Sequence, residues 1–357
     1  MKVALITRST LYTVPGGDTV QIEETARHLQ DINVKARIFL SNQKINYSEF
    51  DLLHFFNLTR PADILHHTHK SKTPYVITPI LVDYAEYDAK HRRGFSGRIL
   101  RSFTSPEYAK TIARWLLFQD HIPAKTYLWK GHREAIHEVL LKSKMVLPNS
   151  IDEGKQLQSF YPSSTPHSVI PNGINEHLFY KDTAIEKDVR LIVCAARIEG
   201  LKNQLSLIKA LNYTQFRLLL VGDPAPNHKS YYKQCRKAAA SNIEFTGRLD
   251  QQQLGNVFRK AKVHVLPSWF ETCGLSSLEA AASGCNVVVT EKGFTSSYFG
   301  REAFYCDPGN AESIYAAVQM AANSDNSKQL LHNIATKFTW RQTALKTREA
   351  YNTCLKN

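Results

Sequence analysis

The stretch VHVLPSWFETCGLSSLEAAASGCNVVVT, residues 263–290, decides the fold of this chain. It begins with a short apolar run that predicts a buried strand at 263–266, and it ends with a second apolar run at 286–290. Between them, Gly274 opens a segment of small residues and Gly284 closes it, which predicts a helix. The order strand, helix, strand predicts one βαβ unit of a parallel sheet.

This unit carries two carboxylates, Glu271 before the helix and Glu279 inside it, eight positions apart. In open α/β sheets, ligands bind at the carboxyl ends of strands and at helix N-termini, where free N–H groups attract anions. We therefore expect a phosphate to bind the amides of Gly274 and Leu275, beside carboxylates that bind hydroxyl groups. Phosphate next to hydroxyl groups indicates a sugar nucleotide as the ligand.

Length and composition limit the class of protein. The chain has 357 residues, which favours two domains over one. Its hydrophobic fraction of 43% and charged fraction of 22% are typical of globular proteins. No apolar run reaches the ~18 residues that span a bilayer, and no signal peptide is evident, so we expect a cytoplasmic protein. The six cysteines form no C-x-x-C pair, which predicts buried free thiols rather than disulfides or a zinc site.

Strand and helix patterns alternate in both halves of the chain, which predicts parallel sheets with helices on both faces. The pattern stops in a stretch rich in Pro, Ser and Asn, and we expect the interdomain linker there, at 166–188. The predicted domains are therefore an N-terminal one at 1–165 and a C-terminal one at 189–340, followed by a helix at 341–357.

Much of the net charge of +13 lies in one segment, 89–144, which has twelve Lys or Arg against four acidic residues. Aromatic residues are interleaved with these basic residues. Such a segment is typical of contact with an anionic membrane surface or an anionic acceptor. A solvated basic helical surface, with its aromatics in the core, explains the pattern too. No nucleic-acid-binding motif accompanies it, so we expect no nucleic acid partner.

Further motifs stand just before the predicted second domain and at the ends of its predicted strands. In chain order they are Pro171-Asn172-Gly173, Arg197, Lys202, Gly222 and Gly247-Arg248-Leu249. Together with the carboxylate pair they resemble the nucleotide-sugar-dependent glycosyltransferases of family 4, the glycosyl transferases group 1. The resemblance implies the GT-B architecture, in which two Rossmann-like α/β domains face each other across a cleft. It also implies that the C-terminal helix crosses back to the N-terminal domain.

The resemblance implies a role for each residue of the site. Arg197 and Lys202 would grip the donor diphosphate and neutralise charge on the departing nucleotide, where phosphate needs fixed positive charge. Glu271 would hold hydroxyls of the transferred sugar and complete the catalytic set, and Glu279 would bind the ribose. The remaining donor-binding positions implied, by backbone contact or packing, are Gly16, Gly17, Gly222, Gly247, Arg248, Leu249, Gly274 and Leu275.

The chain departs from the family after the predicted strand at 75–78. Many members carry a His there, near the reacting centre, whereas this chain reads TPILVDY. Either that function is not required, or it has passed to a residue of the same acceptor-side loop. The candidates for the second case are Asp83, Tyr84 and Glu86. His54, at the end of the preceding strand, is expected to be a packed structural residue.

The resemblance implies transfer of a hexose-type sugar, with retention, from a UDP- or GDP-sugar to an acceptor hydroxyl. No strong protein nucleophile is evident, so we expect front-face attack in which the leaving phosphate oxygen takes the acceptor proton. No D-x-D pair is present, so neither a metal nor another cofactor is expected. The basic segment favours a lipid-linked or anionic glycan acceptor, in cell-surface polysaccharide or lipopolysaccharide synthesis at the cytoplasmic membrane face.

Three alternatives remain. The enzyme could act on a soluble small-molecule acceptor. It could be a catalytically silent GT-B partner protein, although such proteins tend to lose the phosphate-gripping residues that are present here. A dinucleotide-binding oxidoreductase is disfavoured because no G-x-G-x-x-G follows an N-terminal strand.

Overall fold

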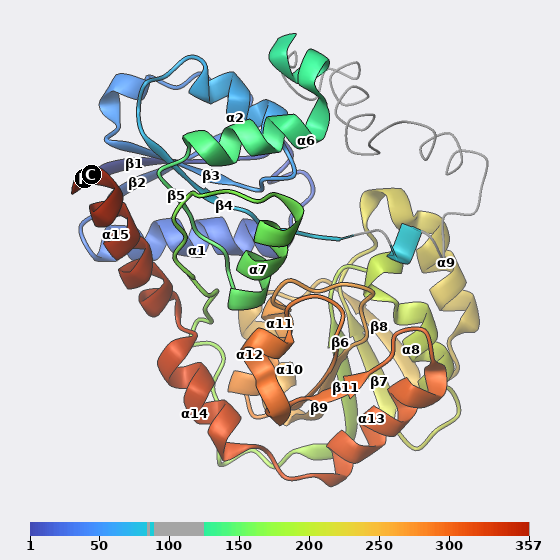
Figure 1. Cartoon of the computed structure of the whole chain (residues 1–357). Coiled ribbons are helices and arrows are strands. Elements are labelled where there is room, and N and C mark those ends of the chain that lie inside the picture. The colour runs from blue at the N-terminus through green and yellow to red at the C-terminus, as the bar shows by residue number, and fades with distance from the viewer. Residues whose placement is uncertain (84–85, 89–124, 357) are drawn as a thin grey trace. The chain divides into compact units, whose positions relative to one another are not determined.

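The computed structural model describes residues 1–83, 86–88 and 125–356 of the chain (Figure 1). It divides into two units, each with its own parallel sheet. The first unit comprises Met1–Leu81, Ala85–Pro171 and Trp340–Asn357, and the second comprises Val82–Tyr84 and Asn172–Thr339.

The sheet of the first unit has the strand order β2-β1-β3-β4-β5. The strands are β1 (Lys2–Thr7), β2 (Lys35–Leu40), β3 (Leu52–Phe56), β4 (Tyr75–Thr78) and β5 (Met145–Val146). The helices are α1 (Gly17–Asp31), α2 (Pro61–Thr68), α6 (Lys125–Lys142), α7 (Ile151–Phe160) and α15 (Trp340–Lys356), with a 3₁₀ turn at Tyr47–Glu49. Nearly every side chain of β1 and β3 is buried, because helices cover both faces of a parallel sheet.

The C-terminal helix α15 belongs to the first unit, as the GT-B architecture implied. It lies beside α1 (Figure 1). Its Tyr351 is fully buried in the same apolar cluster as Ile22 and Leu29 of α1. The C-terminal segment of the chain therefore packs in the core of the first unit, although it follows the second unit in sequence.

The sheet of the second unit has the order β11-β10-β9-β6-β7-β8. Its strands are β6 (Asp188–Ala195), β7 (Arg217–Val221), β8 (Ile243–Gly247), β9 (Ala261–Leu266), β10 (Asn286–Thr290) and β11 (Phe304–Cys306). Its helices are α8 (Gln204–Leu211), α9 (Lys229–Ala238), α10 (Gln251–Lys260), α11 (Leu275–Ala282), α12 (Ser296–Phe299), α13 (Ala311–Asn323) and α14 (Lys328–Lys337), with 3₁₀ turns at Gly200–Lys202, Pro226–His228 and Gly300–Glu302. Numbered from its own first strand, this is the 3-2-1-4-5-6 order of a Rossmann fold.

The predicted linker at 166–188 contains apolar residues that pack into both units. Ile170 is buried in the core of the first unit, whereas Ile174 and Phe179 are buried in the core of the second. The division between the units falls after Pro171. The boundary therefore lies inside the stretch in which the linker was predicted.

The six cysteines are free and buried, as predicted. Burial raises the pKa of the Cys194 thiol to about 12 and that of Cys285 to about 11, so both thiols are protonated at neutral pH. Within the described part of the chain, no helix combines the length and the apolar character needed to cross a membrane.

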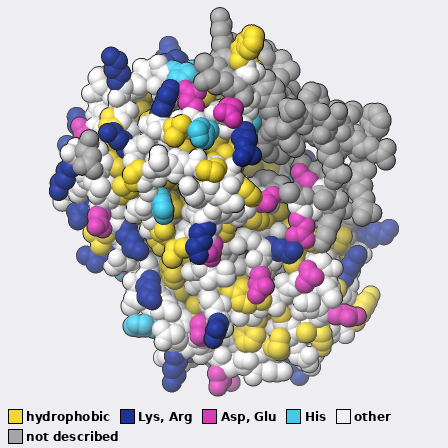
Figure 2. Space-filling view, in the orientation of Figure 1, with side chains coloured by type: hydrophobic (Ala, Val, Ile, Leu, Met, Phe, Trp, Pro, Cys, Tyr) yellow, Lys and Arg dark blue, Asp and Glu magenta, His cyan; other side chains and the backbone are white. Residues whose placement is uncertain are grey.

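On the face of the molecule in Figure 2, lysine and arginine side chains are spread over the described surface rather than gathered into one patch. The largest local excess of positive charge in the sequence is that of 89–144. Of that segment, residues 89–124 lie outside the described residues.

His264 on β9 makes the stability of the fold sensitive to acid. Its ring is fully buried, stacks edge-on against Phe258 at 5.5 Å and finds no hydrogen-bond partner among the described residues. Burial lowers the pKa of His264 to about 3 from its ordinary value of 6.5. Below pH 6.5 the His264 ring therefore binds a proton in the unfolded chain but not in the folded chain. As a result, the free energy of unfolding falls as the pH falls from 6.5 towards 3.

We expect His264→Leu to remove this acid sensitivity. Between pH 6 and pH 5 the wild type should lose about 1 kcal/mol more of its free energy of unfolding than the variant. At pH 7.5 the variant should be at least as stable, because two unpaired ring nitrogens leave the core. Urea denaturation at each pH measures both effects, with the same substitution at the exposed His177 as the control. Parallel pH curves for wild type and variant would contradict the assignment.

Candidate active site

The candidate residues of the second unit lie at the switch point of its sheet, between β6 and β9, where the order of the strands reverses. β6 and β9 are parallel neighbours, and the chain leaves them towards opposite edges of the sheet. Arg197 and Lys202 follow β6, and Glu271 and Gly274 follow β9. Connections that diverge in this way leave a crevice at the carboxyl ends of the strands, which is where open α/β sheets bind ligands.

Lys202 and Glu271 form an ion pair at this point, with Nζ 2.5 Å from Oε1. Both are largely buried, since the Glu271 side chain is 6% exposed and the Lys202 side chain 20%. The fully buried Ser268 donates its Oγ–H to the same Oε1 at 2.6 Å. Two donors on one oxygen fix the orientation of the carboxylate and leave Oε2, which no described residue binds, for a substrate hydroxyl. Ser268 was not predicted from the sequence, although it lies only three positions before Glu271.

The backbone of Glu271 is held by the loop that follows β10. Its N–H donates to the carbonyl of Lys292 at 3.0 Å, and its carbonyl accepts from the N–H of Phe294 at 2.8 Å. Gly293 between them has φ +104°, and a Cβ there would lie 2.1 Å from the Glu271 carbonyl oxygen. Only glycine allows this approach. Gly293 was not predicted either, because its only local signal is a glycine shortly after a strand.

The helix α11 begins at Leu275, directly after Gly274, as predicted. Gly274 adopts the left-handed conformation with φ 70°, and its carbonyl accepts from the N–H groups of Ser277 and Leu278. The first amides of a helix have no acceptor within it, so those of the first turn are the groups that the predicted phosphate contact needs. Glu279 lies in the second turn of the same helix and is partly buried.

Arg197 is held less tightly than Lys202. Its side chain is 38% exposed and lies 3.2 Å from Oε1 of Glu199. Because this guanidinium is partly exposed, solvent weakens the pair, and the guanidinium can turn to an anionic ligand. The backbone is firmer, because Gln204 donates to the carbonyl of Arg197 at 2.8 Å and accepts from the N–H of Glu199 at 3.3 Å.

The predicted nucleobase positions lie at the ends of β7 and β8, on the same edge of the sheet. A Cβ on Gly222, which has φ +141°, would lie 2.1 Å from the carbonyl oxygen of Ala196, so these strand ends approach closely. The segment Gly247–Leu249 ends β8, and the N–H of Arg248 donates to Asp223 at 3.2 Å. The structure thus brings these positions to one sheet edge with Arg197.

Gly16 and Gly17 belong to the first unit, where Gly16 caps α1 and Gly17 begins it. The loop before them is fixed by Arg8, whose guanidinium binds both carboxylate oxygens of Asp18 at 2.5 and 3.0 Å. Arg8 also donates to the carbonyl of Val14 at 2.7 Å. This clamp was not predicted from the sequence, because neither residue belongs to a motif.

On the acceptor side, Asp83 and Glu86 are partly buried, and Tyr84 lies outside the described residues. His54 has the predicted structural role. Its ring is buried, with Nδ1 2.6 Å from the Tyr351 hydroxyl and Nε2 2.8 Å from that of Thr78. Burial lowers the pKa of His54 to about 3, which keeps the ring neutral.

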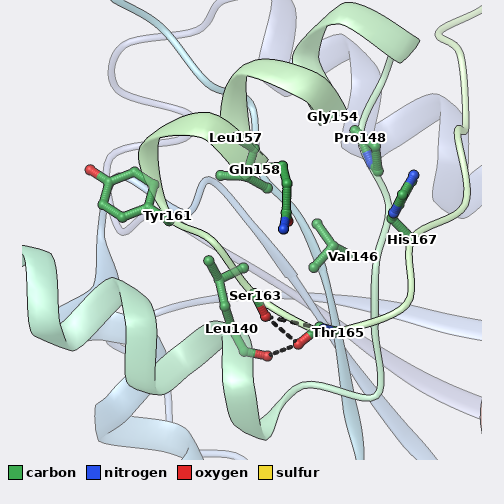
Figure 3. Close-up of a pocket in the computed structure, with 10 residues that line it drawn as sticks. All are labelled: Leu140, Val146, Pro148, Gly154, Leu157, Gln158, Tyr161, Ser163, Thr165 and His167. Atoms are coloured by element: carbon green, nitrogen blue, oxygen red, sulfur yellow. Dashed lines mark hydrogen bonds between the residues drawn. The ribbon is translucent and has the colours of Figure 1, made fainter.

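A surface hollow in the described part of the first unit lies beside α7, and no candidate site residue lines it (Figure 3). Polar groups on its rim bind one another, since the hydroxyl of Thr165 donates to the Leu140 carbonyl and is hydrogen-bonded to that of Ser163 (Figure 3). Another hollow lies at the carboxyl ends of β1 and β3 and includes Arg8. In this strand order that is the switch point of the sheet, where a ligand is expected.

Comparison with known proteins bears on both units. Residues 177–338 match the family model described as Glycosyl transferases group 1. An uncharacterized glycosyltransferase of Methanocaldococcus jannaschii is 21% identical over 352 residues, which cover 96% of each chain. The sulfoquinovosyl transferase of Arabidopsis thaliana is 26% identical over 184 residues, or 48% of this chain and 35% of its own. The chain therefore spans nearly all of the first relative and about a third of the second.

Solved structures share the whole architecture. Sucrose-phosphate synthase from Thermosynechococcus elongatus superposes with a TM-score of 0.77 at 16% identity, covering 100% of this chain and 99% of its own. HepE of Anabaena, solved with UDP and glucose, gives 0.74 at 14% identity, covering 99% and 100%. Such identities establish the fold alone, which is GT-B as predicted. The match over 177–338 places the second unit among the glycosyl transferases group 1.

Proposed function

We propose that this protein transfers a sugar from a nucleoside diphosphate sugar to an acceptor hydroxyl. The observation that carries the proposal is the buried Lys202–Glu271 pair at the switch point of the second sheet. A fixed cation and an oriented carboxylate next to the N-terminus of α11 suit a ligand that joins phosphate to hydroxyl groups. HepE, which shares the fold, is solved with UDP-glucose, so a UDP-sugar is the first donor to test.

In the proposed reaction the protein supplies charge and position. Arg197 and Lys202 stabilise the negative charge that develops on the leaving phosphate, and an ammonium group has further N–H donors besides the one that binds Glu271. Glu271 orients hydroxyls of the transferred sugar through Oε2, while Lys202 and Ser268 hold Oε1. Glu279 binds the ribose.

We propose retention of the anomeric configuration without a metal. The bond from the anomeric carbon to the leaving phosphate oxygen breaks, and the acceptor oxygen bonds to the same face of that carbon. The acceptor proton passes to the leaving phosphate oxygen. Support comes from the two cations, which already supply the charge that a metal would bring.

For the acceptor we propose a lipid-linked or anionic glycan, used in cell-surface polysaccharide or lipopolysaccharide synthesis at a membrane face. The support is the basic segment 89–144, which includes the beginning of α6, where Trp129 is 92% exposed and Leu128 39%. Exposed apolar side chains near basic ones favour an anionic interface. A soluble acceptor and a silent partner protein are the alternatives that the following experiment separates.

The test is a thermal-shift screen with UDP-, GDP- and ADP-sugars. A true donor at 100 times its Kd should stabilise the fold by about 2.7 kcal/mol and so raise the Tm. Arg197→Ala should abolish the shift, because the cation is lost. Arg217→Ala, an exposed arginine of the same unit, is the control and should keep it. If no nucleotide sugar shifts the wild type, the proposed donor site is wrong.

Transfer is then measured with lipid-linked and soluble acceptors in the presence of EDTA. Product with the anomeric configuration of the donor, determined by NMR, is the expected result. Loss of activity in EDTA or an inverted product would contradict the mechanism. A protein that binds the donor but transfers it to neither class of acceptor would favour the silent partner.

A further inference from the structure

The loop that follows β4 in the first unit is strained. Ile80 has φ +48°, in the left-handed region. A β-branched residue rarely adopts this conformation, which is strained and persists only where the surroundings enforce it. The loop continues through Leu81 to Asp83, one of the acceptor-side candidates. The strain therefore lies in the segment to which the acceptor function was assigned.

A buried carboxylate holds this loop. Glu153 lies in the first turn of α7 and is fully buried. Its Oε1 accepts from the N–H of Leu81 at 2.7 Å, and its Oε2 accepts from the N–H of Asn149 at 2.5 Å. One side chain therefore joins the loops that follow β4 and β5, whose carboxyl ends are neighbours in the sheet.

This arrangement is more than a helix cap. The Ser150 hydroxyl already caps α7, since it accepts from the N–H of Glu153 at 3.0 Å. The bond from Oε1 reaches Leu81, 72 positions away in the chain, and satisfies no group of the helix. It acts on the strained loop alone.

The free-energy cost of burying the Glu153 carboxylate supports a positioning role for this residue. No described Lys or Arg pairs with its carboxylate, and burial raises its pKa to about 7 despite two hydrogen bonds that oppose the rise. A buried acid without a cation is a poor choice for stability alone. Its two oxygens can, however, hold two backbone N–H groups at a fixed distance from each other.

The carboxylate itself sits in a rigid frame. Asn149, which donates to Oε2, also accepts from the side chain of Gln21 on α1 at 2.8 Å, and both of these side chains are buried. Glu153 is thus fixed in position by α7, on which it lies, and by α1, through Asn149 and Gln21. Its Oε1 in turn fixes the position of the Leu81 N–H.

We propose that Glu153 is a positioning residue, whose carboxylate holds the strained loop 79–83 in the conformation that places the acceptor. The inference rests on the proposed function, because it concerns the acceptor side of that reaction. Its physical basis is the sensitivity of transfer to geometry, since a misplacement of about 1 Å costs roughly 100-fold in rate.

The test is Glu153→Gln, which keeps the shape of the side chain. Its amide presents one oxygen and one NH₂ to two N–H donors, so one hydrogen bond is lost. We expect kcat/KM for the acceptor to fall roughly 10- to 100-fold, while the thermal shift with the donor is unchanged. Hydrogen exchange at the Leu81 amide should accelerate. Glu49→Gln, an exposed carboxylate of the same unit, is the matched control and should change none of these.

A second substitution tests the strain itself. Ile80→Gly adopts φ +48° without penalty, so the loop no longer needs the clamp to hold it. Added to Glu153→Gln, it should recover part of the lost acceptor kcat/KM. If Glu153→Gln does not fold, Glu153→Asp, one methylene shorter and unable to reach both N–H groups, should show the same selective loss.

Two results would overturn the inference. One is a folded Glu153→Gln with wild-type acceptor kinetics, and the other is unchanged exchange at Leu81. Failure of the proposed function looks different, because then the wild type binds no nucleotide sugar, while exchange at Leu81 still reports on the clamp.

Discussion

Replacing Lys202 with alanine is expected to lower kcat/KM for the donor by about 100-fold or more and the free energy of unfolding by about 3 kcal/mol. The two effects have one cause. The variant lacks the cation that stabilises the leaving phosphate, and it leaves the buried Glu271 carboxylate without its counter-ion. Removing one partner of a buried pair is costly because the other charge stays out of water.

A double-mutant cycle separates these effects. Lys202→Ala combined with Glu271→Gln should regain most of the lost stability, since no buried charge remains unpaired, yet stay inactive. Lys209→Ala, an exposed lysine on the adjoining helix α8, serves as the control. Urea denaturation and initial rates of nucleoside diphosphate release are the measurements. Wild-type activity of Lys202→Ala would exclude the proposed role of this cation.

The second large effect is expected at Gly293, whose replacement by alanine should abolish activity and destabilise the fold by more than about 3 kcal/mol. The new Cβ would lie 2.1 Å from the carbonyl oxygen of Glu271 and 2.9 Å from its carbonyl carbon and nitrogen. These are backbone atoms and cannot turn aside. The clash is relieved only by moving Glu271 or the loop after β10, and either movement misplaces the carboxylate.

Gly300→Ala is the matched control for this prediction. Gly300 also has a positive φ, +53°, but no described atom lies within 4 Å of the position that a Cβ would take there. Its substitution should therefore cost only the strain of an unfavourable backbone conformation, about 1–3 kcal/mol, and leave activity unchanged. Equal losses for the two variants in urea denaturation would show that backbone strain, rather than close approach to Glu271, governs both positions.

Local patterns in the sequence predicted the elements around the site. The apolar runs at 263–266 and 286–290 are β9 and β10, and the helix between them begins after Gly274. These signals are local because a strand or helix depends on the periodicity of its own side chains and on its end residues. At 166–188 the composition indicated the boundary between the units, but not that its isolated apolar residues pack into two different cores.

The sequence by itself therefore predicted most of the strands and helices, although not α7 or β11. It also predicted that they form two α/β units, and which candidate residues stand at the strand ends. Only the tertiary structure decided which of those residues meet. Lys202 finds Glu271 across 69 positions because β6 and β9 are neighbours in the sheet, and Gly293 and Ser268 then hold that carboxylate. Glu153 finds Leu81 across 72 positions in the same way, because β4 and β5 are neighbours. Strand order arises from the packing of whole elements, and periodicity within one element carries no information about it.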